Sequence, residues 1–196
     1  VPNNLPVQLT SFVGRERELA EVKRLLGSTR LLTLSGTGGT GKTRLSLQVG
    51  AEMLDQFYDG VWFVEFATID DGALVAETVA AALDLRQESE RSLVTTLTSF
   101  LRNKRLLLIL DNCEHVVAAC ARLAETLLRS CPQLRILTSS REPLSREELL
   151  APSTQVVADR DVYLGQGQHD VGRRISDDQV ELFVTGDAAP SLQREL

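Results

Sequence analysis

The feature that most constrains the fold of this chain is the eight-residue segment GTGGTGKT at residues 36–43. It follows the apolar run LLTL at 31–34 and precedes a helical pattern that extends to about residue 54. The segment matches the spacing G-x-x-x-x-G-K-[ST] in full. Its glycines let several backbone N–H groups point into one concavity, where the following helix adds the positive end of its dipole. This order of strand, loop and helix predicts a phosphate-binding loop of the Walker A type.

Each residue type in the loop has an expected task. Lys42 would reach the β- and γ-phosphates of a nucleotide, and the Thr43 hydroxyl would bind Mg²⁺. The alternative is a glycine-rich turn that holds no ligand. The residues of this stretch that we expect to bind nucleotide are Gly36, Thr37, Gly38, Gly39, Thr40, Gly41, Lys42, Thr43 and Arg44.

A second motif lies further along the chain, where the aliphatic run 106–110 ends at Asp111. A continuous aliphatic run is typical of a strand that is buried on both faces of a parallel sheet. A carboxylate at the end of such a strand can orient the water shell of Mg²⁺ beside the loop. Taken alone, Asp111 could be a turn residue or a helix cap. With the loop, it predicts a nucleoside triphosphate site in which Thr43 and Asp111 bind magnesium.

Three further polar residues follow strand-like runs. Arg141 comes after the run 134–138 and is placed to sense a γ-phosphate, unless it is simply exposed to solvent. Glu114 and Asn112 are candidates for positioning an attacking water molecule. Asn112 cannot act as a base, and Glu114 could instead open the next helix. We therefore name Lys42, Asp111, Glu114 and Arg141 as the candidate catalytic residues.

Strand-like and helix-like segments alternate along most of the chain. The expected strands cover 31–35, 60–66, 106–110 and 134–138, and helical spacing covers 14–26, 41–54, two segments between 74 and 101, and 116–128. Such alternation predicts right-handed βαβ units. The expected fold class is α/β, a three-layer α/β/α P-loop NTPase with a mostly parallel sheet.

The composition limits the other possibilities. With 196 residues and a net charge of -6, the chain can bury one good core and is a poor candidate for a broad nucleic-acid clamp. No apolar run approaches the length of a membrane span. Three cysteines without a pairing pattern suit a reducing cytoplasm, where we expect structural thiols. Because the chain starts with Val1, we expect a piece of a longer protein.

Five segments together resemble the NTPase core of the bacterial STAND (NB-ARC-like) signalling ATPases. The resemblance covers roughly residues 4–144. Its markers are LPVQLTSFVGRE at 5–16, LLTLSGTGGTGKTRL at 31–45, DGVWFVEFA at 59–67, KRLLLILDNCEHV at 104–116 and LRILTSSREPL at 134–144. Similar cores occur in large regulators with a LuxR-type or winged-helix DNA-binding domain, and in proteins with a class III nucleotide cyclase.

The resemblance implies specific roles and a mechanism. It implies that Asp111 is the Walker B acid, that Arg141 is the sensor arginine, and that the residues packing near the adenine are Phe12, Val13, Gly14 and Arg15. It also implies slow ATP hydrolysis that acts as a timer, with a closed ADP form and an ATP form that opens and self-associates. Such a switch requires that ATP and ADP differ in affinity for the two conformations.

The chain departs from the family pattern in two places. Many relatives end the Walker B strand with two acidic residues, whereas this chain has Asp111 followed by Asn112. After Leu144 the match fades. We divide the chain into a lead-in and adenine-side helix (1–30), the P-loop NTPase core (31–144), and a poorly defined tail (145–196). One interpretation of this tail is the start of a truncated helical domain, with its first helix at 180–184.

The function expected from these observations is an ATP/ADP-binding regulatory switch in a bacterial signalling or transcription-regulating protein. The alternative is a P-loop phosphotransferase or motor ATPase with fast turnover, although the arginine-rich lid of a kinase is not evident. A third possibility is a DNA-binding module, but no helix-turn-helix with a basic recognition helix is evident. We expect any DNA contact to come from segments outside this chain.

Overall fold

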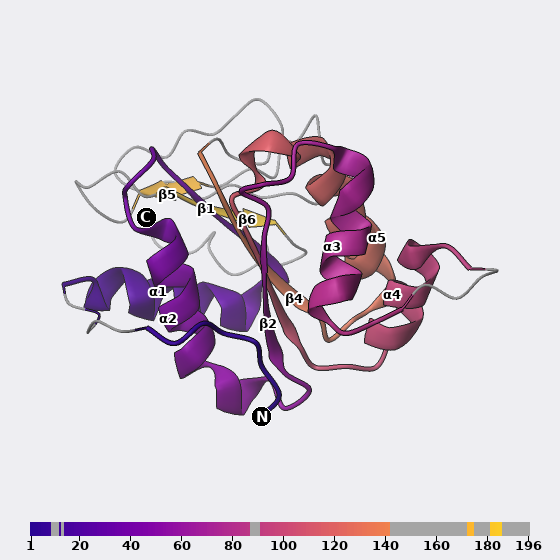
Figure 1. The fold of residues 1–196 in the computed structure, drawn as a ribbon. Helices are drawn as coiled ribbons and strands as arrows, with labels where there is room; N and C mark the ends of the chain where they lie inside the picture. Colours follow the sequence, from indigo (N-terminus) through magenta and orange to yellow (C-terminus); the bar gives the residue numbers. More distant parts are fainter. Residues whose placement is uncertain (9–11, 13, 87–90, 142–171, 175–180, 186–196) are drawn as a thin grey trace, which may run out of the picture.

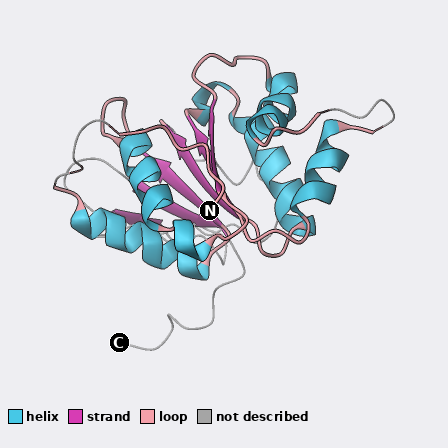
Figure 2. Cartoon of the chain, turned by 60° about the horizontal axis from the view of Figure 1, so that its bottom comes forward, coloured by secondary structure: helices cyan, strands magenta, loops and turns pink. Residues whose placement is uncertain are grey.

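A six-stranded sheet with helices on both faces forms the described part of the chain (Figure 1). The computed structural model describes residues 1–8, 12, 14–86, 91–141, 172–174 and 181–185. Helices α1 and α2 cover one face of the sheet, and α3, α4 and α5 cover the other, as Figures 1 and 2 show from two directions. The expected three-layer α/β/α arrangement is therefore confirmed.

The strands run in the order β2-β3-β4-β1-β6-β5. The first four are parallel, whereas β6 is antiparallel to β1 and β5 is antiparallel to β6. Because β4 lies between β1 and β3, one strand separates the glycine-rich loop from Asp111. The strands are β1 (Leu31–Ser35), β2 (Val61–Glu65), β3 (Leu107–Asp111), β4 (Arg135–Ser140), β5 (Gly172–Arg174) and β6 (Glu181–Thr185).

The helices match the expected helical segments to within a few residues. The α-helices are α1 (Glu16–Ser28), α2 (Lys42–Glu52), α3 (Val75–Ala82), α4 (Leu93–Leu101) and α5 (Val117–Ser130). Short 3-10 helices are η1 (Leu54–Gln56), η2 (Gly72–Leu74) and η3 (Cys113–His115). Helix η3 follows β3 closely, so Glu114 lies near the carboxyl ends of the parallel strands.

The aliphatic run of β3 is buried on both faces of the sheet, as its composition predicts. Leu108 and Leu110 belong to the core beneath α3, α4 and α5. Leu107 and Ile109 belong to the core beneath α1 and α2. Successive side chains of a strand point to opposite faces, so an unbroken aliphatic run fills both layers. This packing fixes Asp111 at the end of a buried interior strand.

The first residues of the chain lie along the outer edge of β2. Val61 donates its N–H to the Pro2 carbonyl at 3.1 Å, and Asn3 forms a parallel bridge with Val61. The Asn4 carboxamide donates to the Phe63 carbonyl at 2.9 Å and accepts from the Phe63 N–H at 2.6 Å. The lead-in therefore satisfies backbone groups that an edge strand would otherwise leave unpaired.

The helix expected at 180–184 is wrong, because residues 181–185 form strand β6. The segment ELFVT contains Phe, Val and Thr, which favour extended backbone. It pairs with the edge of β1, where Leu32 lies opposite Val184. An available strand edge offers a full set of hydrogen bonds and so outweighs a weak helical pattern. The other residues between 145 and 196, apart from β5, lie outside the described part of the chain.

Candidate functional site

The glycine-rich loop joins the end of β1 to the start of α2. Gly39 and Gly41 have positive φ angles of 82° and 77°, which L side chains rarely adopt. Helix α2 begins at Lys42 without a side-chain cap. Because the first N–H groups of a helix have no partner within it, these donors remain available to an anion in the loop.

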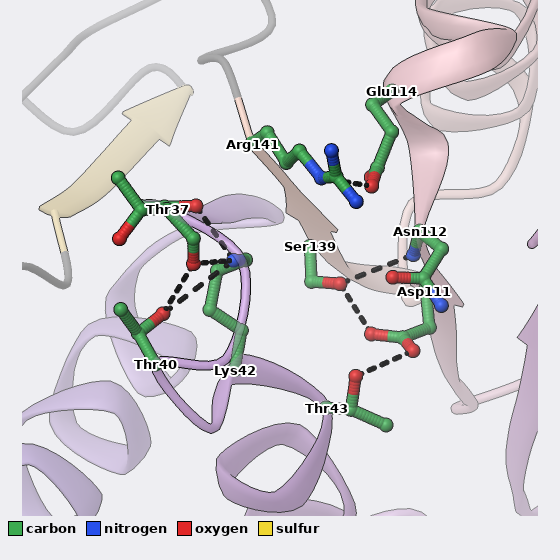
Figure 3. Close-up of polar contacts among 10 residues, drawn as sticks. Thr37, Thr40, Lys42, Thr43, Asp111, Asn112, Glu114, Ser139 and Arg141 are labelled. Atoms are coloured by element: carbon green, nitrogen blue, oxygen red, sulfur yellow. Dashed lines mark hydrogen bonds and ion pairs between the residues drawn. The ribbon is translucent and has the colours of Figure 1, made fainter.

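The side chain of Lys42 is folded back onto the loop (Figure 3). Its ammonium group donates to the carbonyl oxygens of Gly36 at 2.6 Å and Thr37 at 2.9 Å. Burial lowers the pKa of Lys42, with the nearby carboxylates of Glu114 and Asp111 opposing the change. A cation that is only 8% exposed, and whose own loop supplies its bonds, can exchange those carbonyls for phosphate oxygens.

Asp111 is buried where β3 ends, and its side chain is contacted from the start of helix α2 and from strand β4. The Thr43 hydroxyl at the start of α2 donates to its Oδ2 at 2.8 Å. The Ser139 hydroxyl on β4 donates to its Oδ1 and accepts from the Asn112 N–H at 3.2 Å. Burial raises the pKa of Asp111, while the bonds from Ser139 and Thr43 act in the opposite direction. The predicted loop and the predicted acid are therefore joined directly (Figure 3).

The raised pKa of Asp111 leads to a prediction about stability. As pH rises, the Asp111 carboxyl loses its proton at a lower pH in the unfolded chain than in the folded chain. The free energy of unfolding therefore falls as pH rises from the ordinary pKa of 3.8 toward the higher pKa of the folded state. Above the folded pKa the loss is complete and constant. We expect the free energy of unfolding of the wild type, minus that of Asp111→Asn, to decrease as pH increases from about 3.5 to 7. Denaturant titrations of both proteins without nucleotide, at several pH values, would measure this difference in the free energy of unfolding. A difference that rises with pH would contradict a raised pKa of Asp111.

Arg141 and Glu114 form an ion pair above the loop. Arg141 Nε lies 3.0 Å from Glu114 Oε1, and the arginine side chain is 64% exposed whereas the glutamate side chain is 14% exposed. The second carboxylate oxygen of Glu114 is buried and has no hydrogen-bond partner. The structure thus brings the two residues together, although they come from different strand ends (Figure 3).

A pocket of about 490 Å³ contains these groups, a volume within the usual range for a small-molecule site. It joins the glycine-rich loop, the first turn of α2, and the polar residues that follow β3 and β4. The residues that line it are Gln8, Gly38, Gly39, Gly41, Lys42, Thr43, Arg44, Leu47, Asn112, Glu114 and Arg141. Most of the residues predicted from the loop and from the strand ends therefore meet in one cavity.

The residues expected near the adenine, as far as the structure describes them, do not line this pocket. Phe12 packs against the core between the sheet and helices α1 and α2. The buried Nη1 of Arg15 has no hydrogen-bond partner and lies 3.9 Å from the position that a Cβ on Gly41 would take. Gly14 has a φ angle of 88°, and Val13 lies outside the described residues. Of these four residues, none that the structure describes lines the pocket. Gln8 and Leu47 line it instead.

Sequence reasoning missed three residues of the site, namely Ser139, Gln8 and the pocket-lining Leu47. Ser139 connects Asp111 with the Asn112 backbone, and a polar residue at the end of a buried strand was the available signal. Gln8 lines the pocket from the lead-in, and its membership of the segment LPVQLTSFVGRE was the only sign.

The donor set near Asp111 fits a magnesium ion. A hydroxyl oxygen and a carboxylate oxygen lie 2.8 Å apart, and oxygen ligands are those that Mg²⁺ prefers. Within the described part of the chain, no group of three His, Cys, Asp or Glu residues could hold a metal. A cation here would therefore depend on phosphate oxygens and water for its remaining ligands, as is usual for Mg²⁺ with nucleotides.

The described helices are also too short or too polar to cross a membrane. The fold and the loop geometry define a P-loop NTPase of the α/β class. The chain belongs to the NB-ARC family, whose domain matches residues 15–142, well over half of its length. This match confirms the resemblance to STAND P-loop ATPases.

Relatives of the chain occur in mycobacteria. The chain is 46% identical over 136 residues to the uncharacterized protein Rv0894 of Mycobacterium tuberculosis, a match that covers 69% of this chain and 35% of that protein. It is also 46% identical over 123 residues to a protein of the same organism, Rv0890c, provisionally named an HTH-type transcriptional regulator. That match covers 63% of this chain and 14% of the regulator. The chain thus spans about a third or less of these relatives.

Among solved structures, Cdc6p from Pyrobaculum aerophilum is similar in fold. It aligns with a TM-score of 0.54 and 18% sequence identity, covering 76% of this chain and 46% of that protein. At this level of identity the likeness concerns the fold alone. It agrees with a mostly parallel sheet covered by helices on both faces.

Proposed function

We propose that this chain is the nucleotide-binding switch of a larger regulatory protein, in which slow ATP hydrolysis acts as a timer. The observation that carries the proposal is the 2.8 Å hydrogen bond from Thr43 to Asp111. It places a loop hydroxyl beside a buried carboxylate from a different strand, where the two would bind one Mg²⁺. A glycine-rich turn without a ligand gives no reason for burying that carboxylate.

The other loop residues would hold the phosphates. Lys42 would exchange the carbonyls of Gly36 and Thr37 for β- and γ-phosphate oxygens, and the N–H groups of residues 36–44 would surround the phosphate chain. Magnesium, when bound, would neutralise charge on the β- and γ-phosphates. Phe12, Val13, Gly14 and Arg15 stay proposed as the adenine side of the site, since Arg15 lies beside Gly41.

Glu114 and Arg141 would act at the γ-phosphate. Arg141 is the cationic group that follows β4, and its Nε lies 3.9 Å from the position that a Cβ on Gly38 would take. Glu114 would orient the attacking water molecule and accept its proton. In the structure Arg141 holds one oxygen of Glu114, and Asn112 occupies the position where many relatives carry a second acid. Both features support slow hydrolysis.

The regulatory setting of the switch is proposed from the relatives. A mycobacterial relative provisionally named an HTH-type transcriptional regulator supports a role in transcription control. DNA contact would come from segments outside this chain. We further propose that the protein is cytoplasmic, and that its ATP form self-associates while its ADP form stays closed.

Turnover distinguishes the switch from the alternative, a phosphotransferase or motor ATPase. We expect tight binding of both ATP and ADP in the presence of Mg²⁺, with steady-state turnover below about one per minute, far slower than the ~10 s⁻¹ of a typical enzyme. Isothermal titration and a phosphate-release assay on the purified chain would measure both. Turnover of several per second would make the triphosphate a fuel or substrate, and the switch proposal would fail.

A further inference from the structure

We infer that Gln8 reads the nucleotide base, and that its carboxamide selects adenine over guanine. The inference rests on the proposed function, because it concerns the other end of the same pocket. It assigns base selection to a residue of the lead-in that precedes the segment Phe12–Arg15.

The pocket has a phosphate end and a second end. Lys42, Glu114 and Arg141 mark the phosphate end, where β1, β3 and β4 finish (Figure 3). From there the lining continues along α2 through Thr43 to Leu47. Four residues of helix correspond to about 6 Å along the axis. A nucleotide with its phosphates in the loop therefore extends its sugar and base along this face of α2.

The lead-in passes along the same helix. The Leu5 side chain lies about 3.4 Å from the position that a Cβ on Gly50 would take, so this segment contacts α2 further from the loop. Gln8, three residues later, lines the pocket together with Leu47 and Arg44. The path of the lead-in beside α2 at Leu5 points to a position of Gln8 on the α2 side of the pocket. Leu47 supplies an apolar surface for a base beside it.

The side chain of Gln8 has an unused hydrogen-bond acceptor, and a nucleotide base could supply the missing donor. Its Oε1 is buried and accepts no hydrogen bond. A buried acceptor without a donor destabilises the folded chain, so such an atom beside a pocket points to a ligand group that carries an N–H. The exocyclic amine of adenine is such a donor, and a ring nitrogen beside it accepts from the amide N–H. A glutamine carboxamide matches adenine in this bidentate manner.

The test compares three ligands on the purified chain with Mg²⁺: ATP, GTP and inorganic tripolyphosphate. We expect the wild type to bind ATP more tightly than GTP. Gln8→Leu should weaken ATP binding about 5- to 100-fold and bring the ATP-to-GTP ratio close to one, with tripolyphosphate binding unchanged. Gln8→Glu should turn the preference toward GTP, because a carboxylate accepts from both N–H groups of the guanine edge.

Gln48→Leu is the matched control, since Gln48 lies on α2 but bonds to Glu52 and does not line the pocket. It should leave all three affinities unchanged. Thermal melting would confirm that each variant is folded, and Gln8→Glu decides the matter if Gln8→Leu is unfolded. Equal wild-type affinities for ATP and GTP, or an unchanged ratio in the folded Gln8 variants, would overturn the role of Gln8 alone. Failure of the wild type to bind any of the three ligands would overturn the proposed function as well.

Discussion

Replacing Lys42 with alanine is expected to lower the affinity for ATP at least about 100-fold while the domain stays folded. The ammonium group bonds within its own loop, to the carbonyl oxygens of Gly36 and Thr37 and to the Thr40 hydroxyl. Toward a triphosphate it would make charge-assisted bonds, each worth about 1.5–3 kcal/mol, and tenfold in affinity corresponds to about 1.4 kcal/mol. Titration calorimetry with ATP and Mg²⁺ would measure the loss, and circular dichroism would follow the melting temperature.

Lys23→Ala is the control for this experiment. Lys23 on α1 pairs with Glu52 at 2.7 Å, and exposed pairs of this kind contribute at most about 1 kcal/mol to stability. It does not line the pocket. We expect this variant to bind ATP as the wild type does. Unchanged ATP affinity in a folded Lys42→Ala variant would show that the loop is not the nucleotide site.

Replacing Asp111 with asparagine should lower ATP hydrolysis about 100-fold or more, while ATP binding changes little. The carboxylate is the proposed Mg²⁺ ligand next to Thr43, and even groups that only support a metal ligand contribute about 10- to 100-fold to activity. Asparagine keeps the size and one acceptor oxygen for Ser139. Phosphate release at saturating ATP, together with calorimetric affinities, would separate the two effects.

The outcome for Asp111 also distinguishes a functional role from a structural one. Equal losses in binding and hydrolysis would indicate that the carboxylate only holds the loop and β4 together. Asp59→Asn provides a comparison, because Asp59 bonds to the backbone of Arg105 and its carboxylate lies 3.8 Å from Lys104, before the start of β2. That variant should keep both ATP affinity and hydrolysis.

Much of the parallel part of the sheet could be predicted from local patterns. The run 106–110 is aliphatic at every position, and only burial on both faces explains such a run. The glycine spacing of the loop at 36–43 is specific to a phosphate-binding loop. Because such a loop joins a strand to a helix, the strand before it and the helix after it could be predicted as well. Strand β6 was not predictable in this way, because it forms by pairing with the edge of β1, which lies far away in the sequence.

The candidate site was predictable where one residue type serves one kind of chemistry. Lys42, Thr43 and Asp111 belong to this group, and the structure brings them together. Ser139 and Gln8 did not stand out, because serine and glutamine are common polar residues and their positions depend on strand order and on the path of the lead-in. The sequence order of the strands does not show that β4 lies between β1 and β3.

The contacts of Pro2, Asn3 and Asn4 with β2 have a practical consequence for choosing fragment boundaries. The family match begins at residue 15, yet the segment that covers the β2 edge lies before it. A fragment started at the family boundary would leave the N–H of Val61 and both backbone groups of Phe63 unpaired on an outer strand. Such an edge recruits strands from neighbouring molecules. Oligomers of that shortened fragment would then form through the uncovered β2 edge, and they could be mistaken for assembly driven by nucleotide.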